Sequence, residues 1–135
     1  MAKIKIYNTG KAKEPWLIAA LAEYEKRLPF PIEWKLYKDD ESLYAAAAKL
    51  SSFIALDPNG QSMTSEDFAL FFETHSPRHI LIGGATGLPA PIKAQASHLI
   101  SLSPLTFTHQ MTRLILLEQI YRATQILKNS SYHKI

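Results

Sequence analysis

The sequence contains no cysteine among its 135 residues. This absence excludes disulfide bonds, thiolate chemistry and cysteine-based zinc sites, and it fits a reducing compartment. No apolar run approaches the roughly 20 residues that a membrane-spanning helix needs, and the N-terminal residues lack the apolar core of a secretion signal. We therefore expect a cytoplasmic protein that forms one domain over residues 1–135 and has no membrane partner.

Acidic residues are scarce in the last part of the chain. Residues 86–135 contain five Lys and Arg but a single acid, Glu118, whereas residues 1–85 contain ten basic and eleven acidic residues. This asymmetry predicts that an anionic partner such as nucleic acid binds the C-terminal part. The alternative is a mildly basic protein whose charge serves only solubility.

Several common catalytic motifs are also missing. The five histidines are widely separated, so their spacing predicts no metal site. There is no Gly-x-Ser-x-Gly sequence, and the glycine-rich run 83–87 matches neither the P-loop nor the dinucleotide-binding pattern.

Strand-like and helix-like patterns alternate along the whole chain. The patterns predict strands at 3–7, 32–37, 53–56, 80–82 and 99–102, and helices at 15–28, 43–50, about 64–72, 89–97 and 109–127. This order predicts an α/β fold with a mostly parallel sheet flanked by helices. The last eight residues, 128–135, form a polar tail.

Two strands end in segments suited to ligand binding. Glycines at 83, 84 and 87 follow one strand and would let a ligand approach the backbone, although a plain tight turn is an equal alternative. The polar loop 103–108 follows another strand. Asp57 and Gly60 mark a third junction, where the aspartate either accepts a hydrogen bond from a ligand or starts a turn.

The last helix begins with two candidate functional side chains, His109 and Arg113, which are four residues apart on one face. The helix dipole would lower the pKa of His109 and favour a neutral imidazole that can act as a base. A surface pair without function is the alternative. Glu118 and Arg122 are expected to form an ion pair within the helix.

The same helix carries apolar residues on more than one side. They are Met111, Leu114, Ile115, Leu117, Ile120, Tyr121, Ala123 and Ile126. This distribution indicates packing on the sheet and on a second copy of the chain, or else complete burial within one chain.

Five motifs together resemble those of the RlmH family. They are Ile82-Gly83-Gly84-x-x-Gly87, Ser101-Leu-Ser-x-Leu-Thr106, His109-x-x-x-Arg113, Glu118-Gln119-x-Tyr121-Arg122-Ala123 and Tyr132-His133-Lys134. The resemblance implies a SPOUT fold with a C-terminal trefoil knot and a homodimer. It also implies methyl transfer from S-adenosyl-L-methionine to N3 of a pseudouridine in helix 69 of 23S rRNA, on the assembled 70S ribosome.

The resemblance also assigns site residues. The cofactor would contact Leu56, Gly83, Gly84, Gly87, Leu102, Ser103, Pro104, Leu105, Thr106 and Phe107. The residues facing the RNA would be His109, Arg113, Tyr132 and His133. His109 or His133 would take the N3 proton, and Arg113 would stabilise the negative charge that develops on the base.

The segment 38–49 departs from the family because it is shorter and less basic than in most relatives. This difference leaves two other functions open. One is a non-catalytic factor of the same fold that binds RNA or the ribosome. The other is a SPOUT methyltransferase with a different RNA target.

Overall fold

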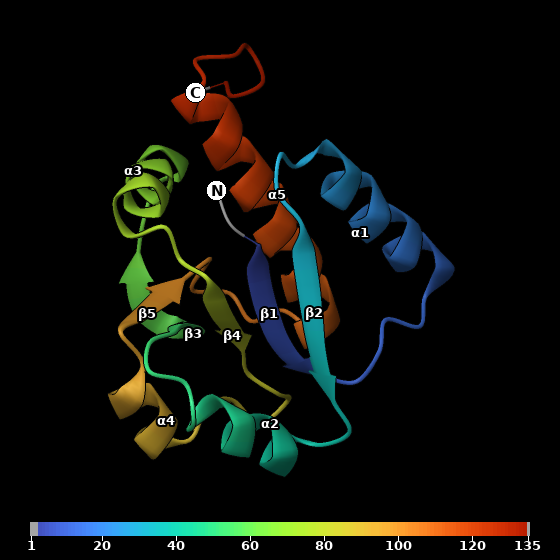
Figure 1. The fold of residues 1–135 in the computed structure, drawn as a ribbon, viewed down its shortest axis with the longest axis vertical. Helices are drawn as coiled ribbons and strands as arrows, with labels where there is room; N and C mark the ends of the chain where they lie inside the picture. Colours follow the sequence, from blue (N-terminus) through green and yellow to red (C-terminus); the bar gives the residue numbers. More distant parts are fainter. Residues whose placement is uncertain (1–2, 135) are drawn as a thin grey trace.

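A computed structural model describes residues 3–134, over which five strands alternate with five helices (Figure 1). The strands are β1 (Ile4–Thr9), β2 (Ile32–Tyr37), β3 (Ile54–Ser62), β4 (His79–Ile82) and β5 (His98–Ser101), and the helices are α1 (Pro15–Arg27), α2 (Asp40–Ala47), α3 (Ser65–His75), α4 (Ala90–Gln95) and α5 (His109–Leu127). The strands form one sheet in the order β2-β1-β4-β3-β5, with every pairing parallel. The predicted α/β fold with a parallel sheet is confirmed. The knot implied by the resemblance stays a prediction.

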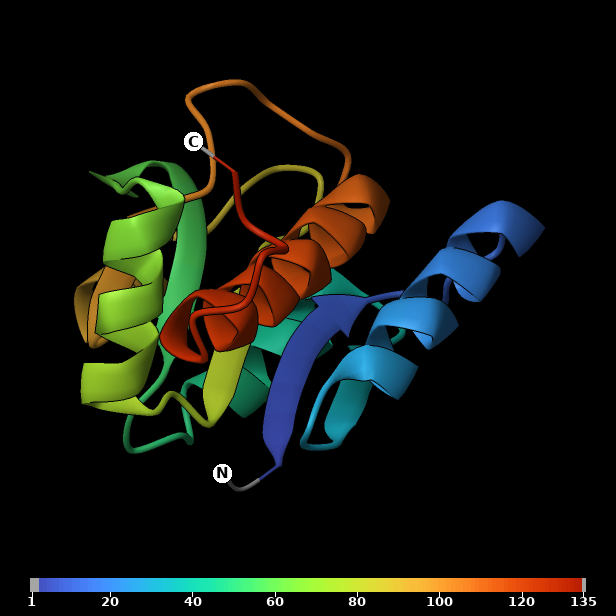
Figure 2. The same cartoon turned by 90° about the horizontal axis from the view of Figure 1, so that it is seen from above.

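Helices cover both faces of the sheet because successive strand residues point to opposite sides. Ile6 and Ile80 belong to a core formed with α1, α3 and α5, whereas their neighbours Tyr7 and Leu81 belong to a second core formed with α2 and α4. Figure 2 shows α3, α5 and α1 side by side over the first face. Burial on both faces explains why β4 and the first part of β3 are almost continuously apolar.

Helix α2 begins three residues before the predicted start. Asp39 is its N-cap, and the Asp39 carboxylate accepts a hydrogen bond from the Ser42 backbone N–H at 2.8 Å. Asp40 and Glu41 therefore lie in the first turn, where the helix dipole favours acidic side chains. The early start places Asp40 next to the carboxyl ends of the strands.

Strand β3 is longer than predicted, since it continues past Leu56 to Ser62. Leu56 and Gln61 both pair with Ile100, so the predicted turn is a bulge inside the strand. A Cβ atom on Gly60 would lie 2.7 Å from the Leu99 carbonyl carbon. Glycine thus permits the close approach of β5, a tertiary requirement that the local pattern does not reveal.

Helix α5 has the predicted bounds and packs between α1 and α3. The Thr108 side chain caps it by accepting a hydrogen bond from the Met111 N–H at 3.2 Å. Leu114, Tyr121 and Ile126 pack against the core, so the chain itself covers part of the second apolar side. Within residues 3–134, no helix combines the length and apolar character needed to cross a membrane.

Candidate active site

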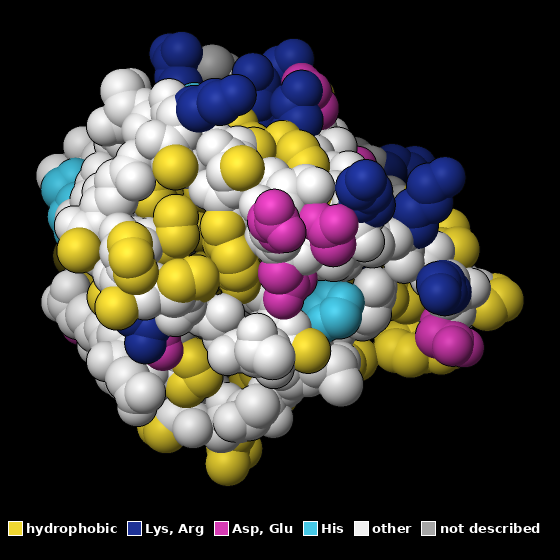
Figure 3. Space-filling model, turned by 90° about the horizontal axis from the view of Figure 1, so that it is seen from below, with side chains coloured by type: hydrophobic (Ala, Val, Ile, Leu, Met, Phe, Trp, Pro, Cys, Tyr) yellow, Lys and Arg dark blue, Asp and Glu magenta, His cyan; other side chains and the backbone are white. Residues whose placement is uncertain are grey.

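A cleft of about 760 Å³ lies at the carboxyl ends of β3, β4 and β5. It is formed by the β3 bulge, the glycine loop 83–88 that follows β4, and the loop 102–108 that leads into α5. This edge of the molecule faces the viewer in Figure 3, where apolar side chains adjoin a group of acidic ones and most Lys and Arg lie near the margin. Crevices at the carboxyl ends of parallel strands are the usual ligand sites of open α/β sheets.

The structure brings together nearly all the residues expected to contact the cofactor. The cleft is lined by Leu56, Gly83, Gly84, Gly87, Leu102, Ser103, Leu105, Thr106 and Phe107. Pro104 is exposed and is not part of the lining. Three segments of the sequence therefore form one concave surface, although its first and last members, Leu56 and Phe107, are more than 40 residues apart.

Tyr44 holds the glycine loop from α2. Its hydroxyl accepts a hydrogen bond from the Gly84 N–H at 3.0 Å and donates one to the Gly87 carbonyl at 2.8 Å. The loop closes on itself through a bond from the Gly87 N–H to the Gly84 carbonyl at 3.0 Å, and Gly87 adopts a φ of +83° that favours glycine. No sequence pattern connects Tyr44 to this loop, so sequence analysis missed it.

Asp40 lies directly against the same loop. A Cβ atom on Gly84 would overlap the Asp40 carboxylate, so only glycine fits beside it. The Asp40 carboxylate also accepts a hydrogen bond from the Thr9 hydroxyl at 2.8 Å. Asp40 therefore lies at the rim of the site.

Asp57 and Lys93 form an ion pair in the cleft wall, with 2.9 Å between the Lys93 ammonium and the Asp57 carboxylate. Burial alone would raise the pKa of Asp57, but the Lys93 ammonium and the Asn59 backbone N–H outweigh it and lower that pKa. Asp57 is therefore ionised at neutral pH, and its charge is balanced by Lys93. Asp57 was noted as a possible hydrogen-bond acceptor, whereas Lys93 gave no signal in the sequence.

His109 lies at the cleft, at the first position of α5. Burial lowers the pKa of His109 and the nearby Arg113 charge lowers it further, while the Asp40 carboxylate acts in the opposite direction. The imidazole is therefore neutral at neutral pH and can accept a proton. The expected lowering is present, with burial and Arg113 as its causes.

Arg113 points away from the cleft lining and is 1% exposed. Its Nε atom donates to the Asn8 side-chain oxygen at 2.7 Å, and its Nη2 atom donates to the carbonyls of Thr9 at 2.9 Å and Gly10 at 2.6 Å. Burial lowers the pKa of Arg113 to about 10, so the group remains charged at neutral pH. Arg113 thus ties the start of α5 to the end of β1.

Asn8 extends this connection to the glycine loop. Its side-chain N–H group donates to the Ile82 carbonyl at 2.9 Å, at the end of β4. The same side chain receives the Arg113 bond, so Asn8 joins α5 to the strand that carries Gly83. A change at Arg113 is therefore expected to reach the cleft through Asn8.

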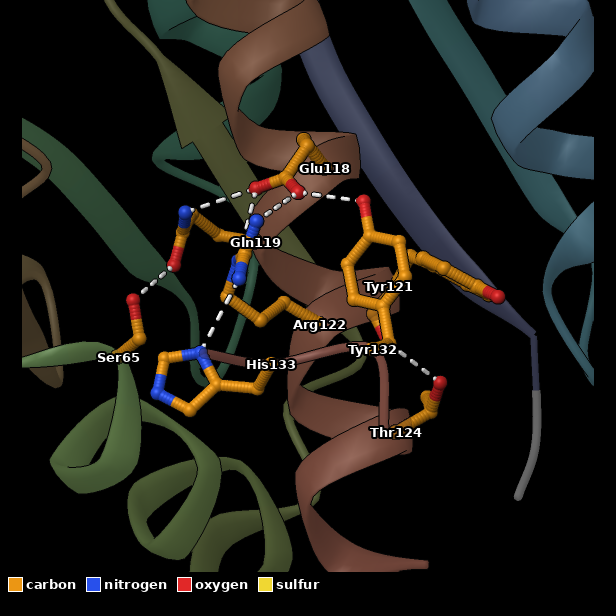
Figure 4. Close-up of polar contacts among 8 residues, drawn as sticks. All are labelled: Ser65, Glu118, Gln119, Tyr121, Arg122, Thr124, Tyr132 and His133. Carbon is orange, nitrogen blue, oxygen red and sulfur yellow. Dashed lines mark hydrogen bonds and ion pairs between the residues drawn. The ribbon is translucent and has the colours of Figure 1, made fainter. Parts of the chain in front are cut away.

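The C-terminal tail is docked on α5 and α3 (Figure 4). The Tyr132 hydroxyl donates to the Glu118 carboxylate at 2.8 Å, and its ring packs edge-on against Tyr121 at 4.8 Å between centroids. The His133 ring lies 3.1 Å from Arg122 and 3.1 Å from the Glu66 carboxylate. Both Tyr132 and His133 of the polar tail are therefore held by contacts with the helices, while residue 135 lies outside the described range.

The Glu118 carboxylate accepts hydrogen bonds from three side chains around the docked tail, those of Tyr132, Arg122 and Gln119. The predicted ion pair with Arg122 is confirmed, with 2.7 Å between the charged groups. The Glu118 carboxylate also accepts a bond from Gln119 at 2.9 Å, and Gln119 accepts one from Ser65 of α3 at 2.8 Å. Burial, followed by the bond to Glu118, raises the pKa of Tyr132, which therefore keeps its proton.

The four residues expected to face the RNA do not converge within one chain. His109 lines the cleft, whereas Tyr132 and His133 dock at the far half of α5. Nine residues separate His109 from Glu118, the Tyr132 partner, which corresponds to roughly 13 Å along the helix axis. Figure 1 likewise shows the segment that follows α5 at the opposite end of this helix from the loop that leads into it.

Comparison with known proteins gave one family and a group of full-length relatives. A family model described as "Predicted SPOUT methyltransferase" matches residues 2–133. A protein of Protochlamydia amoebophila (strain UWE25) named "Ribosomal RNA large subunit methyltransferase H" is 55% identical over 141 residues, covering 99% of this chain and all of the relative. A protein of the same name from Prochlorococcus marinus (strain NATL2A) is 38% identical over 138 residues, covering 96% of this chain and 94% of the relative.

Among solved structures, the chain is similar to TrmJ from Z. mobilis ZM4. The TM-score is 0.50 at 12% identity, and the match covers 90% of this chain and 69% of that one. At this identity the likeness concerns the fold alone.

Proposed function

The chain belongs to the SPOUT methyltransferase family, as a member of the RlmH group, and on that premise we propose that it transfers a methyl group from S-adenosyl-L-methionine to the RNA of the large ribosomal subunit. The observation that carries this proposal is the 55% identity to a large-subunit rRNA methyltransferase over that protein's whole length. The family model spans almost the whole chain, which supports a single SPOUT domain over residues 1–135.

The residues of the cleft fit this cofactor. Leu56, Leu102 and Phe107 offer apolar surface for a planar base, while the glycine loop and the 102–107 loop expose backbone groups for hydrogen bonds. When bound, S-adenosyl-L-methionine supplies a methyl group that its sulfonium centre has already activated. The protein is therefore needed mainly to position the two reactants and to manage one proton.

His109 is the proposed base. N3 of a pseudouridine carries a proton that must leave before or during attack on the methyl group. His109 lines the cleft and its lowered pKa keeps the imidazole free to take that proton. Within one chain His133 is the weaker candidate, because it is docked between Arg122 and Glu66.

Arg113 takes a different role in this proposal from the one the motif implies. Its buried bonds to Asn8, Thr9 and Gly10 make it a positioning residue that holds the start of α5, and with it His109. Its charge also acts on His109 through the lowered pKa of that imidazole.

The finer target is N3 of a pseudouridine in helix 69 of 23S rRNA, on the assembled 70S ribosome, in the cytoplasm. The motif that ends in Tyr132-His133-Lys134 supports this target through the family resemblance. We further propose that the protein acts as a homodimer, in which the tail of one copy reaches the cleft of the other. The separation of His109 from Tyr132 within one chain supports this arrangement.

The proposal is tested by methyl transfer from labelled S-adenosyl-L-methionine to purified 70S ribosomes that lack the modification, with free 23S rRNA in parallel. We expect label only in ribosomes, mapping to one pseudouridine, and none with the His109→Ala variant. Label in another RNA would replace the target. Tight cofactor binding without transfer to ribosomes would also point to another RNA. Absence of both methyl transfer and cofactor binding would favour a non-catalytic factor of the same fold.

A further inference from the structure

Three of the five histidines gather at the sheet edge opposite the cleft. His79 begins β4, His98 begins β5 and His75 ends α3. Together with Arg78, which immediately precedes β4, they line a small pocket of about 100 Å³. Sequence spacing does not indicate this cluster, because the parallel strands bring together residues that are distant along the chain.

The rings of this cluster are held in place by packing. The His75 and His98 centroids lie 4.7 Å apart, and both rings contact Phe71, at 4.4 and 5.0 Å. Nδ1 of His79 is hydrogen-bonded to the Tyr7 hydroxyl at 2.8 Å. The pocket walls are therefore ordered by contacts that do not use a ligand.

Polar groups of this pocket remain available for a ligand. Among the hydrogen bonds and ion pairs within residues 3–134, none uses the Arg78 guanidinium or a ring nitrogen of His75 or His98. The hydroxyls of Ser52 and Ser97, 2.8 Å apart, lie at the same pocket. Arg78 and the two histidine rings can each donate a hydrogen bond, and because the two hydroxyls bond to each other, one of them keeps its hydrogen free to donate.

The local charge is positive. The pocket lining contains no carboxylate, and Glu73, the acid nearest to His75 in the sequence, is not part of it. Burial lowers the pKa of His79, and the charges of Lys5 and Arg78 lower it further, which shows that cations prevail around this ring. Over the described part of the chain there is no group of three side chains able to hold a metal ion. The chemistry therefore suits an anion.

We propose that this pocket binds a phosphate group, either as free phosphate or as part of an RNA backbone. Arg78 supplies the permanent charge and a forked set of donors that matches phosphate oxygens. His75 and His98 supply ring N–H donors, and the free hydroxyl hydrogen of the Ser52–Ser97 pair completes the set. The site is separate from the cleft, since it lies at the opposite ends of the same strands, and it does not depend on the proposed methyl transfer.

The test is a titration of the full chain, followed by backbone amide NMR shifts. Inorganic phosphate is the first probe, and a short single-stranded RNA is the second. We expect saturable shifts centred on residues 75–79 and 97–98, and about tenfold weaker binding in Arg78→Gln, as one charge-assisted contact is lost. The matched control is Lys26→Gln, an exposed change of equal charge on α1. An His98→Gln variant should weaken binding with Arg78 intact.

The two probes distinguish the source of the phosphate. Saturation by inorganic phosphate identifies a free-ion site. Saturation by RNA alone, lost in Arg78→Gln, identifies an RNA backbone contact. The proposal is overturned if neither probe shifts these amides, or if Lys26→Gln weakens binding as much as Arg78→Gln. Unfolding curves of each variant separate a lost contact from a lost fold.

Discussion

His109, the proposed base, is half-buried, and its protonation can be followed through the rate of methyl transfer. A base must be unprotonated, and burial together with Arg113 lowers the pKa of His109 from its ordinary value. We therefore expect the rate to fall as pH decreases, with a midpoint at lower pH than an ordinary histidine would give. The His109→Ala variant should lose roughly 10²–10⁴-fold at the plateau. The measurement is the single-turnover rate against pH.

Asp40 provides a sharper version of this test. The Asp40 carboxylate acts to raise the pKa of His109. The Asp40→Asn variant should therefore lower that pKa, and the decline of the methyl-transfer rate in acid (the acidic limb of the pH profile) should move to still lower pH. A matched change at Asp67, an exposed acid on α3, should leave the limb in place. If Asp40→Asn left the profile unmoved, the limb would belong to another group.

Arg113 is expected to contribute mainly to stability. The Arg113→Ala variant leaves the buried Asn8 side-chain oxygen and the half-buried carbonyls of Thr9 and Gly10 without this donor. We expect the free energy of unfolding to fall by about 2–4 kcal/mol. Arg122→Ala, which breaks a half-exposed ion pair, should cost about 1 kcal/mol or less. Denaturant unfolding compares the two variants. Equal losses of unfolding free energy would show that the burial of Arg113 adds nothing to its contribution to stability.

At the scale of elements, Tyr44 connects α2 to the glycine loop of the cleft in which we propose that the cofactor binds. Tyr44→Phe removes one hydrogen bond to each side of the glycine loop, from Gly84 and to Gly87, without changing the packing of the ring. We expect the dissociation constant for S-adenosyl-L-methionine to rise about five- to tenfold, since the loop must then be ordered on binding. Isothermal titration measures this directly.

Tyr37→Phe is the matched control, because Tyr37 ends β2 at the same sheet edge and is half-buried. It should leave cofactor affinity unchanged. An unaltered affinity in Tyr44→Phe would show that the loop keeps its shape without the hydroxyl.

Sequence periodicity predicted those elements whose form depends on their own residues. Helix α5 has the expected bounds, and the sheet is parallel as the alternation of elements indicated. The extension of β3 was missed because the bulge depends on the contact between Gly60 and Leu99, which belongs to another strand. The contacts of Tyr44 and Asp40 with the glycine loop were missed for the same reason, since neither is local in sequence.

At the scale of the whole molecule, the motifs foresaw which residues surround the cleft but not how the tail lies. Glycines and polar loops mark strand ends, and the parallel sheet brings those ends together. The tail carries no periodicity, so its docking on Glu118 and Arg122 follows only from three-dimensional contacts. One chain therefore presents a cleft with His109 and, separately, a tail with Tyr132.

A mixing experiment decides whether a dimer unites these two parts. One variant carries His109→Ala, and the other lacks residues 131–135; each alone should be inactive in methyl transfer. Random pairing of the two variants makes half of the dimers heterodimers. If a site takes His109 from one copy and the tail from the other, each heterodimer has one intact site. The mixture should then recover about a quarter of the wild-type rate. If each site uses the tail of its own chain, the mixture has no intact site and stays inactive, which would contradict the shared site while leaving the cofactor cleft unaffected.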